Sequence, residues 1–141
     1  MTKQENNHEY FPVVNMGFHR IYLKDISTEN LLEKVHKYKK ENPVSNARSN
    51  RGGYQSEDNI NFHPDFFNLT HDLNNVFYGV FNTPQQRIIS MWINISSYKH
   101  SNYIHTHGND HDFISGVLYL QVPEHSGEIG FINPITHNIE V

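Results

Sequence analysis

The segments RIISMWINISS (residues 87–97) and FISGVLYLQVP (residues 113–123) decide the expected fold class. Both are rich in isoleucine, valine and aromatic residues, the types that favour β-strands. The segments 103–107 and 128–133 have the same character, and turn signals separate all four at intervals of roughly 8 to 12 residues. This spacing is typical of sandwiches and barrels, so the sequence predicts an antiparallel sheet in the C-terminal half.

Two helices are expected before this sheet. The first begins at a Ser27 or Thr28 cap and ends near Glu41, with its apolar residues on one face. The second begins near Pro64, because proline suits the first turn of a helix, and ends before Asn82. Its apolar stripe of helical period consists of Phe67, Leu69, Leu73, Val76, Phe77, Val80 and Phe81.

The rest of the N-terminal half is expected to hold two short strands and a loop. The strands are predicted over residues 9–14 and 18–24, on the same residue preferences. Residues 44–61 are polar and lack periodicity, and they include SNRGGYQS at 49–56, so we expect a loop there. The sequence therefore predicts one α+β domain over residues 1–141, in which two helices support a mostly β core.

The composition excludes several classes of protein. The absence of cysteine excludes disulfide frameworks, thiolate catalysis and cysteine-based metal sites. A net charge of −4 without any basic run argues against nonspecific binding to nucleic acid. No stretch approaches the roughly 18 apolar residues of a membrane span, and the polar start does not resemble a signal peptide. We therefore expect a cytoplasmic protein that does not bind membranes.

Histidine is the residue type with the clearest chemical signal, since 4 of the 11 histidines lie between positions 100 and 111. His105 and His107 are two residues apart on an expected strand, so both side chains point to one face and can reach one metal ion. Asp110 and Asp112 follow closely, and two histidines with one carboxylate form the facial triad of non-haem Fe(II) oxygenases. The spacing alone is also compatible with ordinary surface histidines.

The neighbouring residues extend this pattern. WINI at 92–95, NYIHTH at 102–107 and SGVLYLQVPEHSGEIGFINP at 115–134 occur in this order, and SNRGGYQS at 49–56 precedes them. Together these motifs resemble a family of 2-oxoglutarate/Fe(II)-dependent oxygenases that is common in marine bacteria and their tailed phages. The resemblance covers about residues 45–134, and the motifs are short individually but specific in this order and spacing.

The resemblance implies a double-stranded β-helix (jelly-roll) core, with Fe(II) as the metal and 2-oxoglutarate and O₂ as cosubstrates. It makes His105 the first iron ligand. His107 stands where most 2-oxoglutarate oxygenases have an aspartate, so whether it binds the iron or only neighbours it is open. The further candidates are Asn94 and Tyr119 for the cosubstrate pocket, Asp110 and Asp112 as weaker metal ligands, and Arg51 and Tyr54 for a substrate-side loop.

The chain departs from the family pattern at its C-terminal end. Relatives continue to a late strand with the distal iron-binding histidine and to an arginine that pairs with the far carboxylate of 2-oxoglutarate. This chain stops at Val141, seven residues after Pro134. We therefore expect a jelly roll that is incomplete at its C-terminus, and weak Fe(II) binding without measurable 2-oxoglutarate turnover by the 141-residue chain.

The function expected of the intact protein is that of a hydroxylase-type dioxygenase that acts on a protein side chain or a small molecule. One alternative is a jelly-roll module that binds Zn²⁺ or Ni²⁺ through the same histidines without redox chemistry. Another alternative is a phage structural or accessory protein whose histidines simply lie on the surface. The sequence does not identify the substrate or the oligomeric state.

Overall fold

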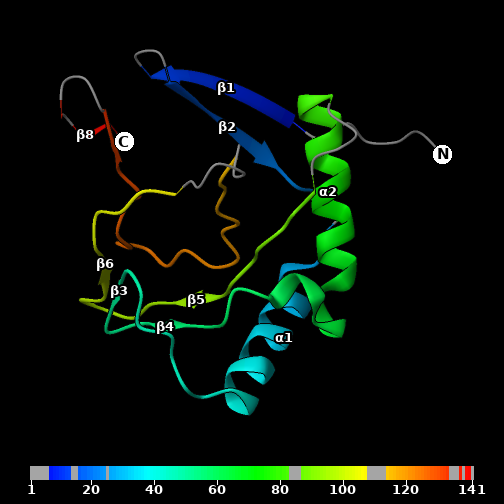
Figure 1. The fold of residues 1–141 in the computed structure, drawn as a ribbon, viewed down its shortest axis with the longest axis vertical. Coiled ribbons are helices and arrows are strands. Elements are labelled where there is room, and N and C mark those ends of the chain that lie inside the picture. The colour runs from blue at the N-terminus through cyan, green and yellow to red at the C-terminus, as the bar shows by residue number, and fades with distance from the viewer. Residues whose placement is uncertain are drawn as a thin grey trace. The chain divides into compact units, whose positions relative to one another are not determined.

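The computed structural model describes residues 7–13, 16–24, 26–82, 87–107, 114–133, 137 and 139–140. Contacts divide the chain into two compact units, one formed by Met1–Ile26 with Pro123–Val141 and the other by Ser27–Val122. Within the described residues the chain is α+β, because it combines α-helices with two-stranded antiparallel sheets (Figure 1). Both α-helices belong to the unit Ser27–Val122.

The unit formed by Met1–Ile26 and Pro123–Val141 contains a β-hairpin. Strand β1 (Asn7–Val13) pairs with β2 (Met16–Tyr22) in an antiparallel register that runs from Asn7 opposite Tyr22 to Val13 opposite Met16. The strands predicted at 9–14 and 18–24 are therefore present with shifted ends, and Val14 lies outside the described residues.

A second, shorter pair belongs to the same unit. Strand β7 (Phe131–Ile132) pairs antiparallel with β8 (Ile139–Glu140). The ring of Phe18 stacks on the ring of Phe131 with 5.7 Å between their centroids. Aromatic stacking of this kind joins β7 to the β1–β2 hairpin.

Helix α1 (Thr28–Glu41) forms where the sequence predicts it. The Ser27 side chain accepts a hydrogen bond from the backbone N–H of Asn30, which satisfies one donor of the first turn. Leucine, valine and tyrosine at helical spacing are buried on one face, at Leu31, Val35 and Tyr38. Two lysines in the last turn suit the negative end of the helix dipole.

Helix α2 (Phe67–Phe81) follows two 3₁₀ turns, η1 (Ile60–Phe62) and η2 (Pro64–Phe66). The predicted start at Pro64 is confirmed, since this proline opens η2. The helix ends at Asn82, which adopts the left-handed conformation with φ of 51°. Of the predicted apolar stripe only Leu69 is fully buried, and Phe67 is 53% exposed.

The core lies at the junction between the buried face of α1 and the turns η1 and η2 that precede α2. Phe66 is 2% exposed, and its ring contacts those of Tyr38 at 6.2 Å and His63 at 5.8 Å between centroids. The buried apolar residues are Leu31, Val35, Tyr38, Tyr54, Ile60, Phe66, Leu69 and Ile93.

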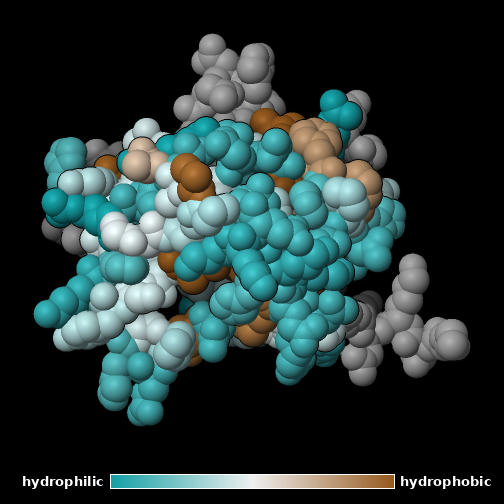
Figure 2. Space-filling model, turned by 90° about the horizontal axis from the view of Figure 1, so that it is seen from below, coloured by the Kyte–Doolittle hydropathy of each residue, from teal (hydrophilic) through white to brown (hydrophobic). Residues whose placement is uncertain are grey.

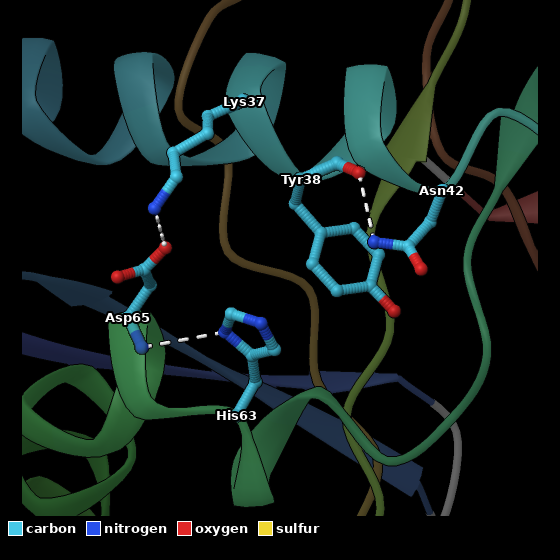
Figure 3. Close-up of polar contacts among 5 residues, drawn as sticks. All are labelled: Lys37, Tyr38, Asn42, His63 and Asp65. Carbon is cyan, nitrogen blue, oxygen red and sulfur yellow. Dashed lines mark hydrogen bonds and ion pairs between the residues drawn. The ribbon is translucent and has the colours of Figure 1, made fainter.

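Polar contacts fix the same junction at its edge (Figure 3). The Lys37 ammonium donates to the Asp65 carboxylate at 2.9 Å, and so connects α1 to η2. The backbone N–H of Asp65 donates to Nδ1 of His63, which therefore caps η2.

We expect the Lys37–Asp65 contact to make stability depend on pH at both extremes. The hydrogen bond from Lys37 holds the pKa of the Asp65 carboxyl below its usual value, and the same bond raises the pKa of Lys37. The contribution of Asp65 is therefore present above its unfolded pKa and is lost as pH falls through its lower folded pKa. That of Lys37 is present below its unfolded pKa and is lost as pH rises through its higher folded pKa.

Titration of the side-chain carboxyl signals by NMR measures this effect. The Asp65 pKa should rise toward its usual value in Lys37→Gln. An unchanged Asp65 pKa in that variant would show that Lys37 does not set it.

The predicted C-terminal sheet is present only in fragments, since β7 lies within the predicted strand 128–133 and the other predicted segments are mostly not strands. Residues 103–107 and 114–122 form no strand, and residues 87–97 form only β5 (Asn94–Ile95) and an isolated bridge. Strand β6 (Ser101–Asn102) precedes the predicted strand 103–107 instead of coinciding with it. Strand-type residues become a strand only where a second segment supplies the hydrogen bonds, and within the described residues segment 114–122 has no such partner.

Large apolar side chains are exposed at scattered positions and along one segment that includes Ile114, Val117, Leu118, Tyr119 and Val122. Within the described residues, neither helix combines the length and the apolar character that crossing a membrane requires. The face drawn in Figure 2 is mostly hydrophilic, with hydrophobic residues showing as separate small patches. Exposed apolar residues of this kind are normal for a folded protein.

Candidate metal centre

Short strand pairs position the segment that carries the candidate ligands. Strand β3 (Asn50–Arg51) pairs antiparallel with β6, and the backbone N–H of Tyr103 donates to the Ser49 carbonyl at 2.8 Å. These bonds fix the chain at the first residue of the segment 103–107. His105 and His107 lie just beyond, on exposed backbone outside the strands.

The structure brings the rings of His105 and His107 together. Their Nε2 atoms are 2.9 Å apart, and the ring centroids are 4.7 Å apart with 65° between the ring planes. Both side chains are exposed. Two imidazole nitrogens therefore converge on one point that solvent can reach.

The backbone sets the tautomer of His105. Its Nδ1 lies 2.6 Å from the carbonyl oxygen of Tyr103. A carbonyl oxygen only accepts hydrogen bonds, so Nδ1 must carry the proton and Nε2 presents a lone pair. In the absence of metal, Nε2–H of His107 then donates to Nε2 of His105. A backbone acceptor behind one ring nitrogen is the usual support of a metal-binding histidine.

Trp92 orients the second imidazole. Its ring stacks on that of His107 with 5.6 Å between centroids and 12° between planes. Trp92 is half-buried, with His107 against its face. The motif WINI at 92–95 marked this residue in the sequence but did not show which side chain it contacts.

The spacing of the two nitrogens fits a shared divalent ion. Two nitrogens that each lie about 2.0–2.1 Å from one ion, at about a right angle, are about 2.9 Å apart. This separation equals the one between the Nε2 atoms of His105 and His107. Within the described residues no third histidine or carboxylate joins the pair. Asp110 and Asp112 lie outside those residues, so their role stays a prediction.

The segment SNRGGYQS is not the loop that the sequence predicts. It contains β3 and β4 (Tyr54–Gln55), and β4 pairs antiparallel with β5. Ser56 continues this pairing, because its N–H donates to the Ile93 carbonyl and its hydroxyl accepts from the Ile93 N–H. Tyr54, Gln55 and Ser56 are all buried. The prediction failed because two-residue strands show no periodicity, and their partners lie about forty to fifty positions later.

Glycine at position 52 is required by close packing. Gly52 has φ of 84°, and a Cβ atom added there would lie 2.6 Å from Cδ2 of His100. The His100 ring is itself held in place, since its Nδ1 accepts a hydrogen bond from the N–H of Ser97. The turn between β3 and β4 therefore packs directly against the turn that precedes β6.

We expect Gly52→Ala to lower the free energy of unfolding by about 1–3 kcal/mol, because alanine is strained at positive φ and also clashes with His100. The matched control is Gly79→Ala in α2, where a Cβ meets nothing within 4 Å and alanine favours the helix. Urea unfolding of both variants measures the effects, which should have opposite signs. Equal changes in the two variants would contradict this packing.

The structure separates the two residues predicted for a substrate-side loop. The guanidinium of Arg51 lies 4.3 Å from the ring centroid of Tyr103, the residue whose carbonyl supports His105. Tyr54 is buried instead, and its hydroxyl donates to the Asn42 carbonyl at the end of α1. Arg51 is therefore a neighbour of the histidine segment, whereas Tyr54 faces the helix.

The two residues predicted for the cosubstrate pocket do not contact the histidines. Asn94 is exposed on β5 opposite Gln55, and Tyr119 is 56% exposed in a segment without strands. In the part of the chain that the structure describes, neither one shows a hydrogen bond or a ring contact with His105 or His107. Their role stays a prediction.

Comparisons with known proteins do not place the chain in a family. It matches no protein-family model, no curated protein and no solved structure. Its function must therefore be inferred from its own residues.

Proposed function

We propose that this chain carries the metal-binding histidines of a hydroxylase-type dioxygenase that depends on Fe(II) and 2-oxoglutarate. The observation that carries the proposal is the 2.9 Å separation of the Nε2 atoms of His105 and His107, with Tyr103 and Trp92 supporting the two rings. The flanking motifs resemble those of 2-oxoglutarate/Fe(II)-dependent oxygenases, and this resemblance is the reason for proposing 2-oxoglutarate and O₂ as cosubstrates. The double-stranded β-helix fold of that family is part of the proposal.

When bound with 2-oxoglutarate and O₂, the metal would supply the chemistry that oxidises a substrate C–H bond and converts 2-oxoglutarate to succinate and CO₂. His105 and His107 would hold it, with the Tyr103 carbonyl keeping His105 in the tautomer that presents Nε2. Because both side chains are exposed, a cosubstrate could reach an ion held by them. The exposure also means that two imidazoles alone hold the ion loosely.

Linkage between the metal and 2-oxoglutarate tests the proposal without requiring turnover. The chain is titrated anaerobically with Fe(II), followed by calorimetry, in the presence of 2-oxoglutarate or of succinate at the same concentration. Succinate lacks the 2-oxo group that allows chelation. We expect 2-oxoglutarate to tighten Fe(II) binding relative to succinate, and His105→Ala to remove this difference.

Two results would contradict the proposal. Equal Fe(II) affinity with 2-oxoglutarate and succinate would favour a metal-binding module without this chemistry. Fe(II) binding that is unchanged in His105→Ala would show that the histidine pair is an ordinary surface feature.

A further inference from the structure

Residues 114–122 form an exposed stretch of strand-type sequence that lacks a strand partner. Within the part of the chain that the structure describes, they join no sheet and make no backbone hydrogen bond. All of them except Leu120 are exposed, and Figure 1 draws them as an orange trace without an arrow. Unpaired backbone groups of this kind are a template for pairing with another chain. His105 and His107 lie outside the stretch, so pairing through it would be independent of the proposed function.

An extended backbone would give this stretch one apolar face, because alternate residues of a strand share a face. That face would hold only apolar residues and glycine, namely Ile114, Gly116, Leu118, Leu120 and Val122. The other face would be mixed, with Ser115, Val117, Tyr119 and Gln121. None of these residues has a positive φ, so extension requires only that the bend at Leu120 straightens.

The apolar face is complementary to itself in an antiparallel pair. When Leu118 lies opposite Leu118 of a second copy on a two-fold axis, Ile114 meets Val122. In the same register the small Gly116 meets the larger Leu120, so side chains of unequal size interlock. Apolar pairs directly across two strands are contacts that stabilise a sheet. One register therefore brings the whole apolar face of one copy alongside that of the other.

The mixed face and the lack of charge favour the same partner. A shift of the register by one residue would place the apolar face of one copy beside Ser115 and Gln121 of the other, which disfavours that register. In the first register Val117 meets Tyr119, a favourable pair of a β-branched and an aromatic residue. Residues 114–122 include no acidic residue, lysine, arginine or histidine. Two copies therefore meet without charge repulsion, whereas a charged partner finds no complementary group.

The exposed apolar area sets the expected strength of the contact. The large apolar residues of the stretch are 38–62% exposed, and together they expose on the order of 400 Å² per copy. Two copies would bury roughly 800 Å² through them, which is less than the roughly 1,200 Å² at which stable specific interfaces begin. We propose that residues 114–122 pair antiparallel with the same residues of a second copy, and that the chain forms a weak two-fold dimer in this way.

Sedimentation velocity over a concentration series, from about 10 µM to about 1 mM, measures the association. We expect a monomer at the lowest concentration and a growing fraction of dimer above it, as the small interface predicts. Amide hydrogen exchange at both ends of the series locates the contact. Every second amide of residues 114–122 should exchange more slowly at the high concentration, because these amides then donate to the partner strand.

Charge placed at the two-fold axis tests the register. Leu118→Lys and Leu118→Glu should each weaken dimer formation by at least about tenfold, since like charges then lie directly opposite each other. An equimolar mixture of the two variants should recover the dimer, because opposite charges meet at that position. Val44→Lys, at a position that is 87% exposed, is the matched control and should leave the association unchanged.

Several results would overturn the proposal. A monomer at every concentration would show that the stretch does not associate, and growth beyond the dimer would show aggregation without a two-fold contact. A dimer without slower exchange in residues 114–122 would place the interface elsewhere. Slow exchange of these amides already in the monomer would mean that a segment of the same chain covers them. Failure of the mixed variants to associate would exclude the register with Leu118 on the axis.

Discussion

Substitution of Phe66 by alanine is expected to lower the free energy of unfolding by about 3–5 kcal/mol. Phe66 is 2% exposed and its ring contacts Tyr38 from α1 and His63 from the turn before η2. Removing the ring leaves a cavity at the centre of the junction, and neighbours held by helices fill such a cavity poorly. Urea unfolding followed by the fluorescence of Trp92 measures the loss.

The adjacent phenylalanine is the matched control. Phe67 is 53% exposed, so Phe67→Ala should cost less than about 1 kcal/mol. A similar loss in both variants would mean that Phe66 is not the centre of the core.

Substitution of His105 by alanine is expected to weaken divalent metal binding by at least about 10-fold. Removing a group that hydrogen-bonds to a metal-ligating side chain typically lowers metal affinity about 10- to 100-fold. Removing the ligating side chain itself should lower the affinity at least as much. The remaining imidazole of His107 would then bind the ion alone. Titration with Co²⁺, followed by its visible absorption, measures the affinity.

The control for this prediction is His71→Ala. His71 is an exposed histidine on α2 whose ring contacts Asn75, so its removal should leave the metal affinity unchanged. Equal losses in His71→Ala and His105→Ala would indicate that the ion binds without a specific site.

The helices were predictable because their determinants are local. Ser27 caps α1 within three residues of the group that it bonds, and Pro64 opens the turns that precede α2 at the position where proline fits. Residues three and four apart share a face in a helix, so a single stretch of sequence shows which face is buried. The β1–β2 hairpin was predictable for a similar reason, since its strands are neighbours in the chain.

The other strands depend on partners that the sequence does not show. Tyr54 pairs with Ile95 and Arg51 with Ser101, in strands of two residues that contain no repeating pattern. Residues 114–122 have stronger β-type composition but form no strand in the structure. Composition indicates which residues tolerate a strand, whereas hydrogen-bond partners decide whether one forms.

The candidate metal centre was predictable in part. The two-residue spacing of His105 and His107 indicated a shared face on an expected strand. Residues 103–107 form no strand, yet the structure places the two Nε2 atoms 2.9 Å apart. The support from Tyr103 could not be predicted from residue type, because the group that acts is its backbone carbonyl. The contact of Trp92 with His107 depends on chain geometry that joins residues fifteen positions apart.

The most direct test of the histidine pair as a metal site is a long-range ¹H–¹⁵N NMR spectrum of the histidine rings, recorded with and without Zn²⁺ as a diamagnetic ion. We predict that without metal His105 carries its proton on Nδ1, as its bond to the Tyr103 carbonyl requires. On addition of one equivalent of Zn²⁺, the Nε2 signals of both His105 and His107 should shift to metal-bound values while Nδ1 of His105 stays protonated. Unchanged Nε2 signals, or metal binding through other histidines, would contradict the claim that this pair is a metal site.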